Sequence, residues 1–138
     1  MHTLWIPIIA CLGAQFIKVI VSFIIEKKLN FKRLIEPGGM PSSHTATVIS
    51  LATSVGLSEG FESVAFAICV VFAMIVMYDA TNLRRAVGKQ ARILNKIMDE
   101  MEKSQPVSEE KLRELLGHTP IEVLFGGILG IAIAFMFR

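Results

Sequence analysis

Two histidines in this chain lie in sequence contexts that suit phosphate chemistry. The first, His44, follows the segment Gly38-Gly39-Met40-Pro41-Ser42-Ser43. Ser42 or Ser43 can cap the helix that begins here, and the amides of a first helical turn favour an anion such as phosphate. His44 would then give or take a proton beside the bound group. An ordinary helix start after a Gly-Pro loop explains the same residues equally well.

The second histidine, His118, precedes Thr119-Pro120-Ile121-Glu122, a capping-box pattern with proline at the first helical position. Phosphoryl transfer is catalysed mainly by positioning and by cations and amides that stabilise charge. Two histidines can divide the remaining work, one as nucleophile or base and the other as the acid that protonates the leaving oxygen. Further polar residues that composition does not explain are Gln15, Lys18, Asp79, Arg84 and Arg85.

Each of these candidates also has a purely structural explanation. Lys18 can extend its stem to the membrane surface, and Arg84 and Arg85 can contact lipid headgroups. Glu122 already has a backbone partner if the capping box forms. His118 can be an ordinary histidine at the membrane interface. Which explanation holds depends on whether the helices bring these side chains together.

Four apolar segments predict an all-α fold, a polytopic bundle of membrane helices that forms one membrane domain over residues 1–138. Hydrophobic residues make up 53% of the chain and its mean hydropathy is +0.59, which is high for a soluble protein. A helix needs roughly 20 residues to cross a bilayer. The two middle segments are shorter, which suits a tight hairpin or partial shielding by protein. The predicted spans are 4–25, 43–57, 62–78 and 120–137.

The segment between the third and fourth spans, residues 79–117, has a different character. Its apolar residues repeat at helical spacing from Leu83 to Met101, and Lys and Arg cover the other sides. This pattern predicts an amphipathic helix that lies at the interface or packs across the membrane helices. Of the 14 Lys and Arg residues, four lie in the loop 26–41 and eight in 79–117. The positive-inside rule therefore places both segments and both histidines in the cytoplasm, with the termini outside.

The motifs resemble those of the type 2 phosphatidic acid phosphatase and vanadium haloperoxidase superfamily, and in particular its small divergent branch. Pro41-Ser42-Ser43-His44 is similar to the superfamily's Pro-Ser-Gly-His motif, and Leu116-Gly117-His118-Thr119-Pro120-Ile121-Glu122 to its later histidine motif. The resemblance implies that His118 is a nucleophile that forms a phosphohistidine. It implies that Glu122 orients the ring and that His44 is the acid. It also implies phosphate contacts from Lys18, Ser42, Ser43, and Arg84 or Arg85.

The chain departs from the superfamily pattern at several positions. Ser43 stands in place of a glycine, Glu122 in place of an aspartate, and no Arg-Pro pair follows Lys18. Membrane phosphatases of the superfamily usually have six spans and a site that faces away from the cytoplasm, whereas this chain has four predicted spans and its charges predict an inward-facing site. These departures motivate a second hypothesis, a non-catalytic membrane protein that binds phosphorylated lipid headgroups.

We expect an integral protein of a bacterial cell membrane that hydrolyses a phosphomonoester or diphosphate of a lipid-like substrate, with no metal or other cofactor. A third hypothesis places Asp79 and Glu122 with the two histidines around a divalent ion, because carboxylates beside phosphate suit Mg²⁺. The expected partners are membrane lipids or lipid phosphates and no nucleic acid. Gly126 and Gly130 form a face that allows helices to approach closely, so a homodimer through it is also possible.

Overall fold

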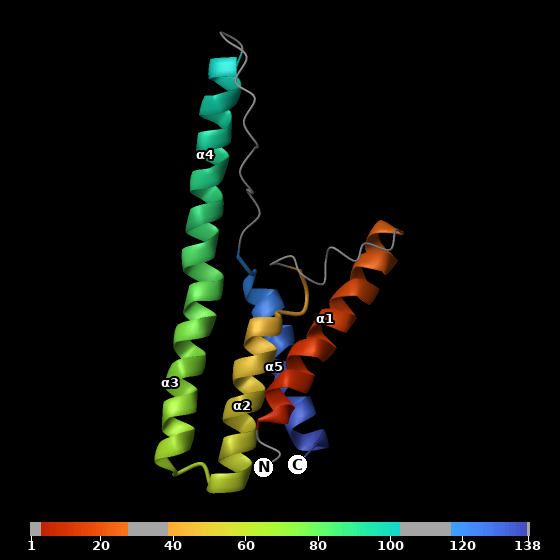
Figure 1. Cartoon of the computed structure of the whole chain (residues 1–138), viewed down its shortest axis with the longest axis vertical. Coiled ribbons are helices and arrows are strands. Elements are labelled where there is room, and N and C mark those ends of the chain that lie inside the picture. Colours follow the sequence, from red (N-terminus) through yellow and green to blue (C-terminus); the bar gives the residue numbers. More distant parts are fainter. Residues whose placement is uncertain (1–3, 28–38, 103–116, 138) are drawn as a thin grey trace.

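The structure is a computed structural model, and it describes residues 4–27, 39–102 and 117–137. These residues form helices and no strands, which confirms the predicted all-α class. The elements, shown in Figure 1, are α1 (Trp5–Glu26), α2 (Ser43–Glu59), α3 (Val64–Tyr78), a π-helical turn η2 (Asp79–Leu83), α4 (Arg84–Glu102) and α5 (Pro120–Met136).

The helices differ in how well they suit a membrane. Two are long and apolar enough to cross one, Trp5–Ile24 and Val64–Met101, and Pro120–Met136 is a shorter apolar helix. In contrast, α2 carries many hydroxyl residues, and Ser43, Ser50 and Ser54 are among those it buries. Neighbouring helices therefore shield α2. That all four helices cross the bilayer stays a prediction.

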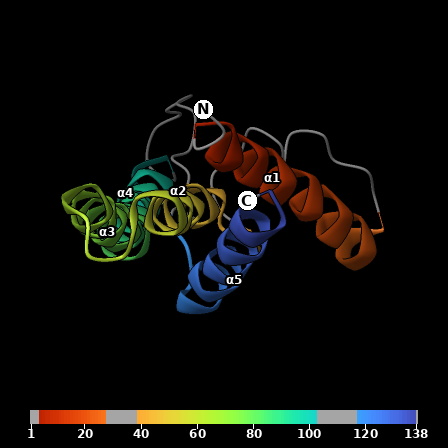
Figure 2. The same cartoon turned by 90° about the horizontal axis from the view of Figure 1, so that it is seen from below.

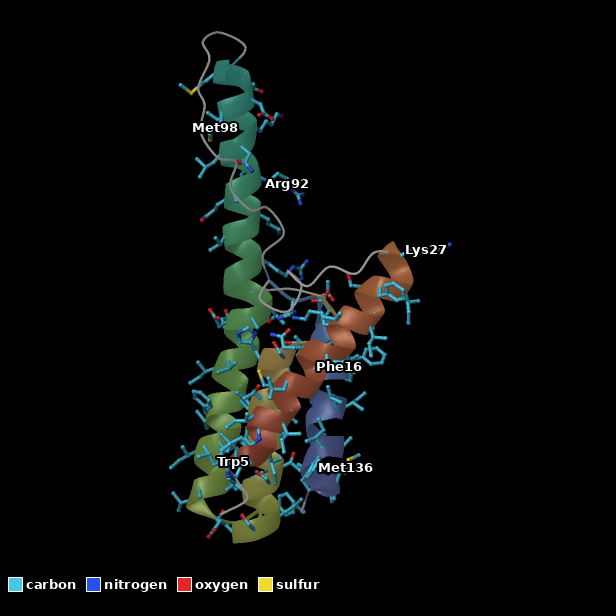
Figure 3. The ribbon with its side chains drawn as sticks, turned by 45° about the vertical axis from the view of Figure 1, so that its right-hand side comes forward. Trp5, Phe16, Lys27, Arg92, Met98 and Met136 are labelled. Atoms are coloured by element: carbon cyan, nitrogen blue, oxygen red, sulfur yellow. The ribbon has the colours of Figure 1, made fainter. Side chains whose placement is uncertain are left out.

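The central helix of the bundle is α2, which lies between α3 on one side and α1 and α5 on the other (Figure 2). Large apolar side chains such as Trp5, Phe16 and Met136 are exposed on the outside, as a lipid-facing surface requires (Figure 3). Small residues let membrane helices approach closely, and alanines dominate the interior. The core consists of Ile6, Ala10, Ala14, Ala46, Ile133 and Ala134.

Gly126 and Gly130 of α5 lie directly against the backbone of α2. A β-carbon at Gly126 would lie 2.5 Å from the carbonyl oxygen of Ser42, and one at Gly130 would lie 2.6 Å from that of Ala46. Both distances are too short for any side chain, so the two glycines set the approach of α5 to the first half of α2. The glycine face is thus in use within the chain, and a homodimer stays a prediction.

The charged helix α4 does not pack across the other helices (Figure 1), which was one of the two predicted arrangements, and a position at the membrane interface stays a prediction. It continues from α3 through η2 as one helix and projects beyond the ends of α2 and α5 (Figure 1). No glycine or proline occurs between Val64 and Val87, so the chain has no point at which to turn. The π-helical turn instead adjusts the register, and Thr81 Oγ1 donates to the carbonyl oxygen of Met77 at 2.9 Å.

The two ends of the bundle are distinct. Both chain termini and the turn between α2 and α3 lie at one end, and α4 projects from the other (Figure 1). We call the latter the histidine end, because α2 and α5 begin there at Ser43 and Pro120. Toward this end α1 leans away from α2 and α5, as both views show (Figures 1 and 2). Any site at the histidine end is therefore built from the starts of α2 and α5 and from the second half of α1.

Candidate functional site

His44 and His118 lie beside each other at the histidine end. Their ring centroids are 5.9 Å apart and the ring planes are inclined at 59°. His44 belongs to the first turn of α2, and His118 immediately precedes the cap of α5. A group in hydrogen-bond contact with a nitrogen of each ring would lie about 3 Å from both. The spacing thus allows one phosphate-sized group to contact the two imidazoles.

A carboxylate and a main-chain bond hold the His118 ring, which is 1% exposed. His118 Nδ1 lies 2.9 Å from Glu122 Oε2, and its backbone amide donates to the carbonyl oxygen of Ala80 at 2.9 Å. An ionised carboxylate only accepts hydrogen bonds, so Nδ1 carries the proton in this pair. The lone pair of the neutral ring is then on Nε2, where it can attack phosphorus.

Glu122 fulfils its capping role at the same time. Its Oε2 accepts from the amide of Thr119 at 3.1 Å, and the Thr119 hydroxyl accepts from the amide of Glu122 at 3.3 Å. The predicted capping box is therefore confirmed. The structural explanation and the functional one are not alternatives here, because the cap fixes the oxygen that contacts the imidazole.

Ser42 is the N-cap of α2, which decides between the two predicted serines. Its Oγ accepts from the amide of Thr45 at 3.3 Å and from Thr45 Oγ1 at 3.1 Å, and the side chain is fully buried. Its own amide donates to the carbonyl oxygen of Glu122 at 3.0 Å. Ser42 therefore joins the starts of α2 and α5. Ser43 is the first residue of α2 and is also buried.

Lys18 is 3% exposed, so it is covered by protein and does not extend its stem to the surface. Its side chain packs against Gly39, where a β-carbon would lie 3.4 Å from Lys18 Cγ and Cδ. Gly39 has a φ of 84°, a conformation that favours glycine. The loop that leads to Ser42 thus passes directly over the lysine, which associates this cation with the start of α2.

The remaining predicted site residues lie on η2, α4 and α1. Asp79 begins η2 next to Ala80, whose carbonyl oxygen accepts from His118. Arg85 is exposed on α4, and none of the described contacts brings it to the histidines. The side chain of Arg84 lies outside the part of the chain that the structure describes. Gln15 lies one turn further along α1 from Lys18, away from the histidine end, with its Oε1 buried.

The geometry does not support a shared divalent ion. Within residues 4–27, 39–102 and 117–137, no three His, Cys, Asp or Glu side chains are grouped so that they could hold a metal. The hypothesis that Asp79 and Glu122 join the two histidines around a cation therefore lacks a ligand set in this part of the chain.

Two residues of this region, Thr45 and Ser22, were not predicted from the sequence as part of the site. Thr45 holds the hydroxyl of Ser42 through both its amide and its side chain. Ser22 is buried one turn beyond Lys18, at 9% exposure. A polar residue four positions from a candidate lysine on the same helical face was a usable signal. The role of Thr45 was not visible, since threonine in a first helical turn is common.

Comparison with known proteins agrees with these motifs. A model of the family described as the Divergent PAP2 family matches residues 1–133. The chain is 42% identical over 135 residues to the "Uncharacterized membrane protein YuiD" of Bacillus subtilis (strain 168), an alignment that covers 90% of this chain and 85% of that protein. No solved structure matches the chain. With nearly the whole chain covered by the family model, the protein belongs to the Divergent PAP2 family.

Proposed function

We propose that this protein is a membrane phosphatase that hydrolyses a phosphomonoester or diphosphate of a lipid-like substrate through a phosphohistidine on His118. The observation that carries the proposal is the arrangement of two imidazoles. One is held by a carboxylate at 2.9 Å, and its ring centroid lies 5.9 Å from that of the other. Nucleophile, orienting group and proton donor form a recurring unit of covalent catalysis.

The reaction has two steps. In the first, His118 Nε2 attacks phosphorus, the bond from phosphorus to the leaving oxygen breaks, and His44 gives that oxygen a proton. In the second, His44 removes a proton from water, whose oxygen attacks phosphorus, and the bond from phosphorus to His118 Nε2 breaks. Inorganic phosphate is released and His118 is restored. Glu122 keeps Nδ1 protonated throughout and stabilises the positive charge that the ring gains when its Nε2 bonds to phosphorus.

Charge stabilisation comes from the surroundings of the two rings. The amides of the first turn of α2 favour an anion, and Ser42 holds that turn in place. Lys18 supplies a buried cation beside the loop that enters this turn. A buried ammonium next to a phosphate acts in a low-dielectric setting, where its effect on developing charge is largest.

The test is phosphate release by the purified protein in detergent or nanodiscs from a panel of phosphatidate, phosphatidylglycerophosphate and a prenyl phosphate. His118→Ala should lower the rate by on the order of 10³-fold or more, because the nucleophile is lost. A radiolabelled substrate should leave an acid-labile phosphoryl group on the wild type and none on this variant. Equal background release by both proteins over the whole panel would refute the proposal.

His44→Ala separates the acid from the nucleophile. Loss of a proton donor lowers the rate by roughly 10²- to 10⁴-fold for a poor leaving group such as an alkyl alcohol. The loss should be much smaller for an aryl phosphate, whose leaving oxygen needs no proton. The same loss for both substrates would assign His44 another role.

A second candidate function is non-catalytic binding of phosphorylated headgroups. It is favoured by Ser42, a residue of the motif shared with the phosphatases, whose fully buried hydroxyl here caps α2 by accepting two hydrogen bonds from Thr45. Lipid binding that survives His118→Ala without any turnover would support this function. Binding no tighter than to any anionic bilayer would count against it.

A further inference from the structure

The buried face of α1 changes character along its length. In the half near the termini it is apolar, and Ile6, Ala10 and Ala14 belong to the bundle core. In the half near the histidine end, Lys18 and Ser22 continue the four-residue spacing of Ala10 and Ala14, and Gln15 lies beside this line; we call Gln15, Lys18 and Ser22 the polar stripe. Steps of three, four and seven residues place all three side chains within one narrow sector of the helix. Lys18 and Ser22 thus follow Ala10 and Ala14 of the core in the half of α1 that leans away from α2 and α5; the lean is visible in Figures 1 and 2.

Two atoms of the polar stripe are buried without a hydrogen bond. In the described part of the chain neither Gln15 Oε1 nor Ser22 Oγ has a partner, and Ser22 is 9% exposed. A buried polar atom left unsatisfied costs about 1–3 kcal/mol, so such atoms mark places where a further group binds. These two lie one turn to either side of Lys18, the cation assigned above to the phosphate.

We infer that the polar stripe binds the polar part of a lipid phosphate, with Gln15 Oε1 accepting a hydrogen bond from a hydroxyl group next to the ester. This inference rests on the proposed function and narrows it: the substrate is a phosphate ester of a polyol lipid rather than of a simple alcohol. An amide oxygen needs a donor, and ionised phosphate oxygens only accept hydrogen bonds. A hydroxyl group is the donor that such a headgroup carries.

The positions of Gln15 and Ser22 along α1 indicate which part of the lipid phosphate each residue binds. Gln15 lies further from the histidine end than Lys18 does, and Ser22 lies closer to it. The rise per residue of a helix puts Gln15 and Ser22 about 10 Å apart along the axis, too far to share one hydroxyl. The apolar tail of a lipid extends toward the middle of the bundle, so the leaving alcohol lies on the Gln15 side. Ser22 Oγ is then available to donate to the phosphate.

The experiment compares two substrates with identical acyl chains. Phosphatidylglycerophosphate carries a free hydroxyl beside its terminal phosphate, and phosphatidate carries none. For the wild type, kcat/KM should favour the first by about tenfold or more, since sites built to bind a hydroxyl reject analogues without it. Gln15→Met, which keeps the length of the side chain, should reduce this ratio about tenfold. Ser22→Ala should lower both values together and leave the ratio unchanged.

Stability and a matched control separate this role from a structural one. Ser58→Ala removes an exposed serine at the opposite end of the bundle and should change neither ratio nor rate. Gln15→Met removes an unsatisfied buried acceptor, so its Tm should stay the same or rise. An unchanged substrate ratio in Gln15→Met would overturn the inference, and would mean that water alone satisfies the amide.

Failure of the proposed function would be recognised separately. If the wild type hydrolyses neither lipid, the two lipids are compared by native mass spectrometry for retention on the protein. A wild type that is not a phosphatase can still retain phosphatidylglycerophosphate better than phosphatidate. If Gln15→Met abolishes that preference, the hydroxyl-binding site is supported in the absence of catalysis. Equal retention of both lipids by the wild type would overturn it.

Discussion

At the scale of single residues, one oxygen connects the fold to the candidate site. Glu122 Oε2 accepts from the amide of Thr119 and also contacts Nδ1 of His118. The imidazole is therefore oriented by the first turn of the helix that follows it, while the backbone amide of His118 is held by the carbonyl oxygen of Ala80. The proton on Nδ1, and with it the lone pair on Nε2, follows from that single contact.

Glu122→Gln should separate the cap from the catalytic role. The amide oxygen of Gln can still accept from Thr119, so the free energy of unfolding should fall by less than about 1 kcal/mol. The neutral amide no longer stabilises a positively charged imidazole, so phosphate release should drop by on the order of 10² or more. Thermal unfolding and phosphate release on the same preparation check the two effects.

The control for this variant is Glu59→Gln, which neutralises an exposed carboxylate at the other end of α2. It should leave both measurements as they are. Full activity in Glu122→Gln would mean that the charge on this carboxylate plays no part in the reaction.

At the scale of helices, the site depends on how α5 meets α2. The amide of Ser42 donates to the carbonyl oxygen of Glu122 at 3.0 Å, so the first turns of the two helices are bonded directly. Gly126 and Gly130 allow that approach, because a β-carbon at either position would overlap the backbone of α2. The distance between the two histidines is thus set by a glycine contact and a main-chain bond.

Gly130→Ala should destabilise the protein, although alanine favours a helix. Its β-carbon would lie 2.6 Å from the carbonyl oxygen of Ala46, so α5 must move away from α2, at a cost of roughly 1–3 kcal/mol. Gly127→Ala is the matched control, since its β-carbon would meet only Thr45 Cγ2 at 3.8 Å. Thermal unfolding in detergent compares the two. Equal Tm values would show that the two helices do not rely on this contact.

At the scale of the whole molecule, the bundle has two chemically different ends. The histidine end carries the starts of α2 and α5 and the long charged helix α4, and the other end carries the termini and a short turn (Figure 1). Of the 14 Lys and Arg residues, four lie in residues 26–41, which precede α2, and eight in residues 79–117, which include α4. The positive-inside rule therefore predicts that this end faces the cytoplasm.

Cysteine labelling in whole cells tests this orientation. In a background without Cys11 and Cys69, Ser58→Cys places a thiol at the end with the termini and Lys89→Cys places one on α4, both at exposed positions. A membrane-impermeant maleimide should label the first in intact cells and the second only after permeabilisation. The reverse pattern would put the histidines outside, as in the membrane phosphatases of the superfamily.

Several features of this protein followed from the sequence alone, because they depend on residues a few positions apart. The capping box at Thr119 and Glu122, the helix start after Pro41 and the presence of a helix in each of the four predicted segments are of this kind. Each depends on local hydrogen bonds or on helical periodicity, which the chain carries without reference to its fold. The family resemblance rested on the same short motifs, and the family match confirmed it.

Only the tertiary structure decided how these pieces meet. Nothing local required the rings of His44 and His118 to lie 5.9 Å apart, Gly126 and Gly130 to contact α2 instead of a second chain, or Lys18 to be buried under Gly39. The continuation of α3 into α4 was not predicted, since amphipathicity does not tell whether a helix bends where its composition changes. Helix packing depends on the shapes of two surfaces distant in sequence. The motif that begins at Gly38 thus suggested an anion site, and the packing of α5 on α2 brought the second histidine to it.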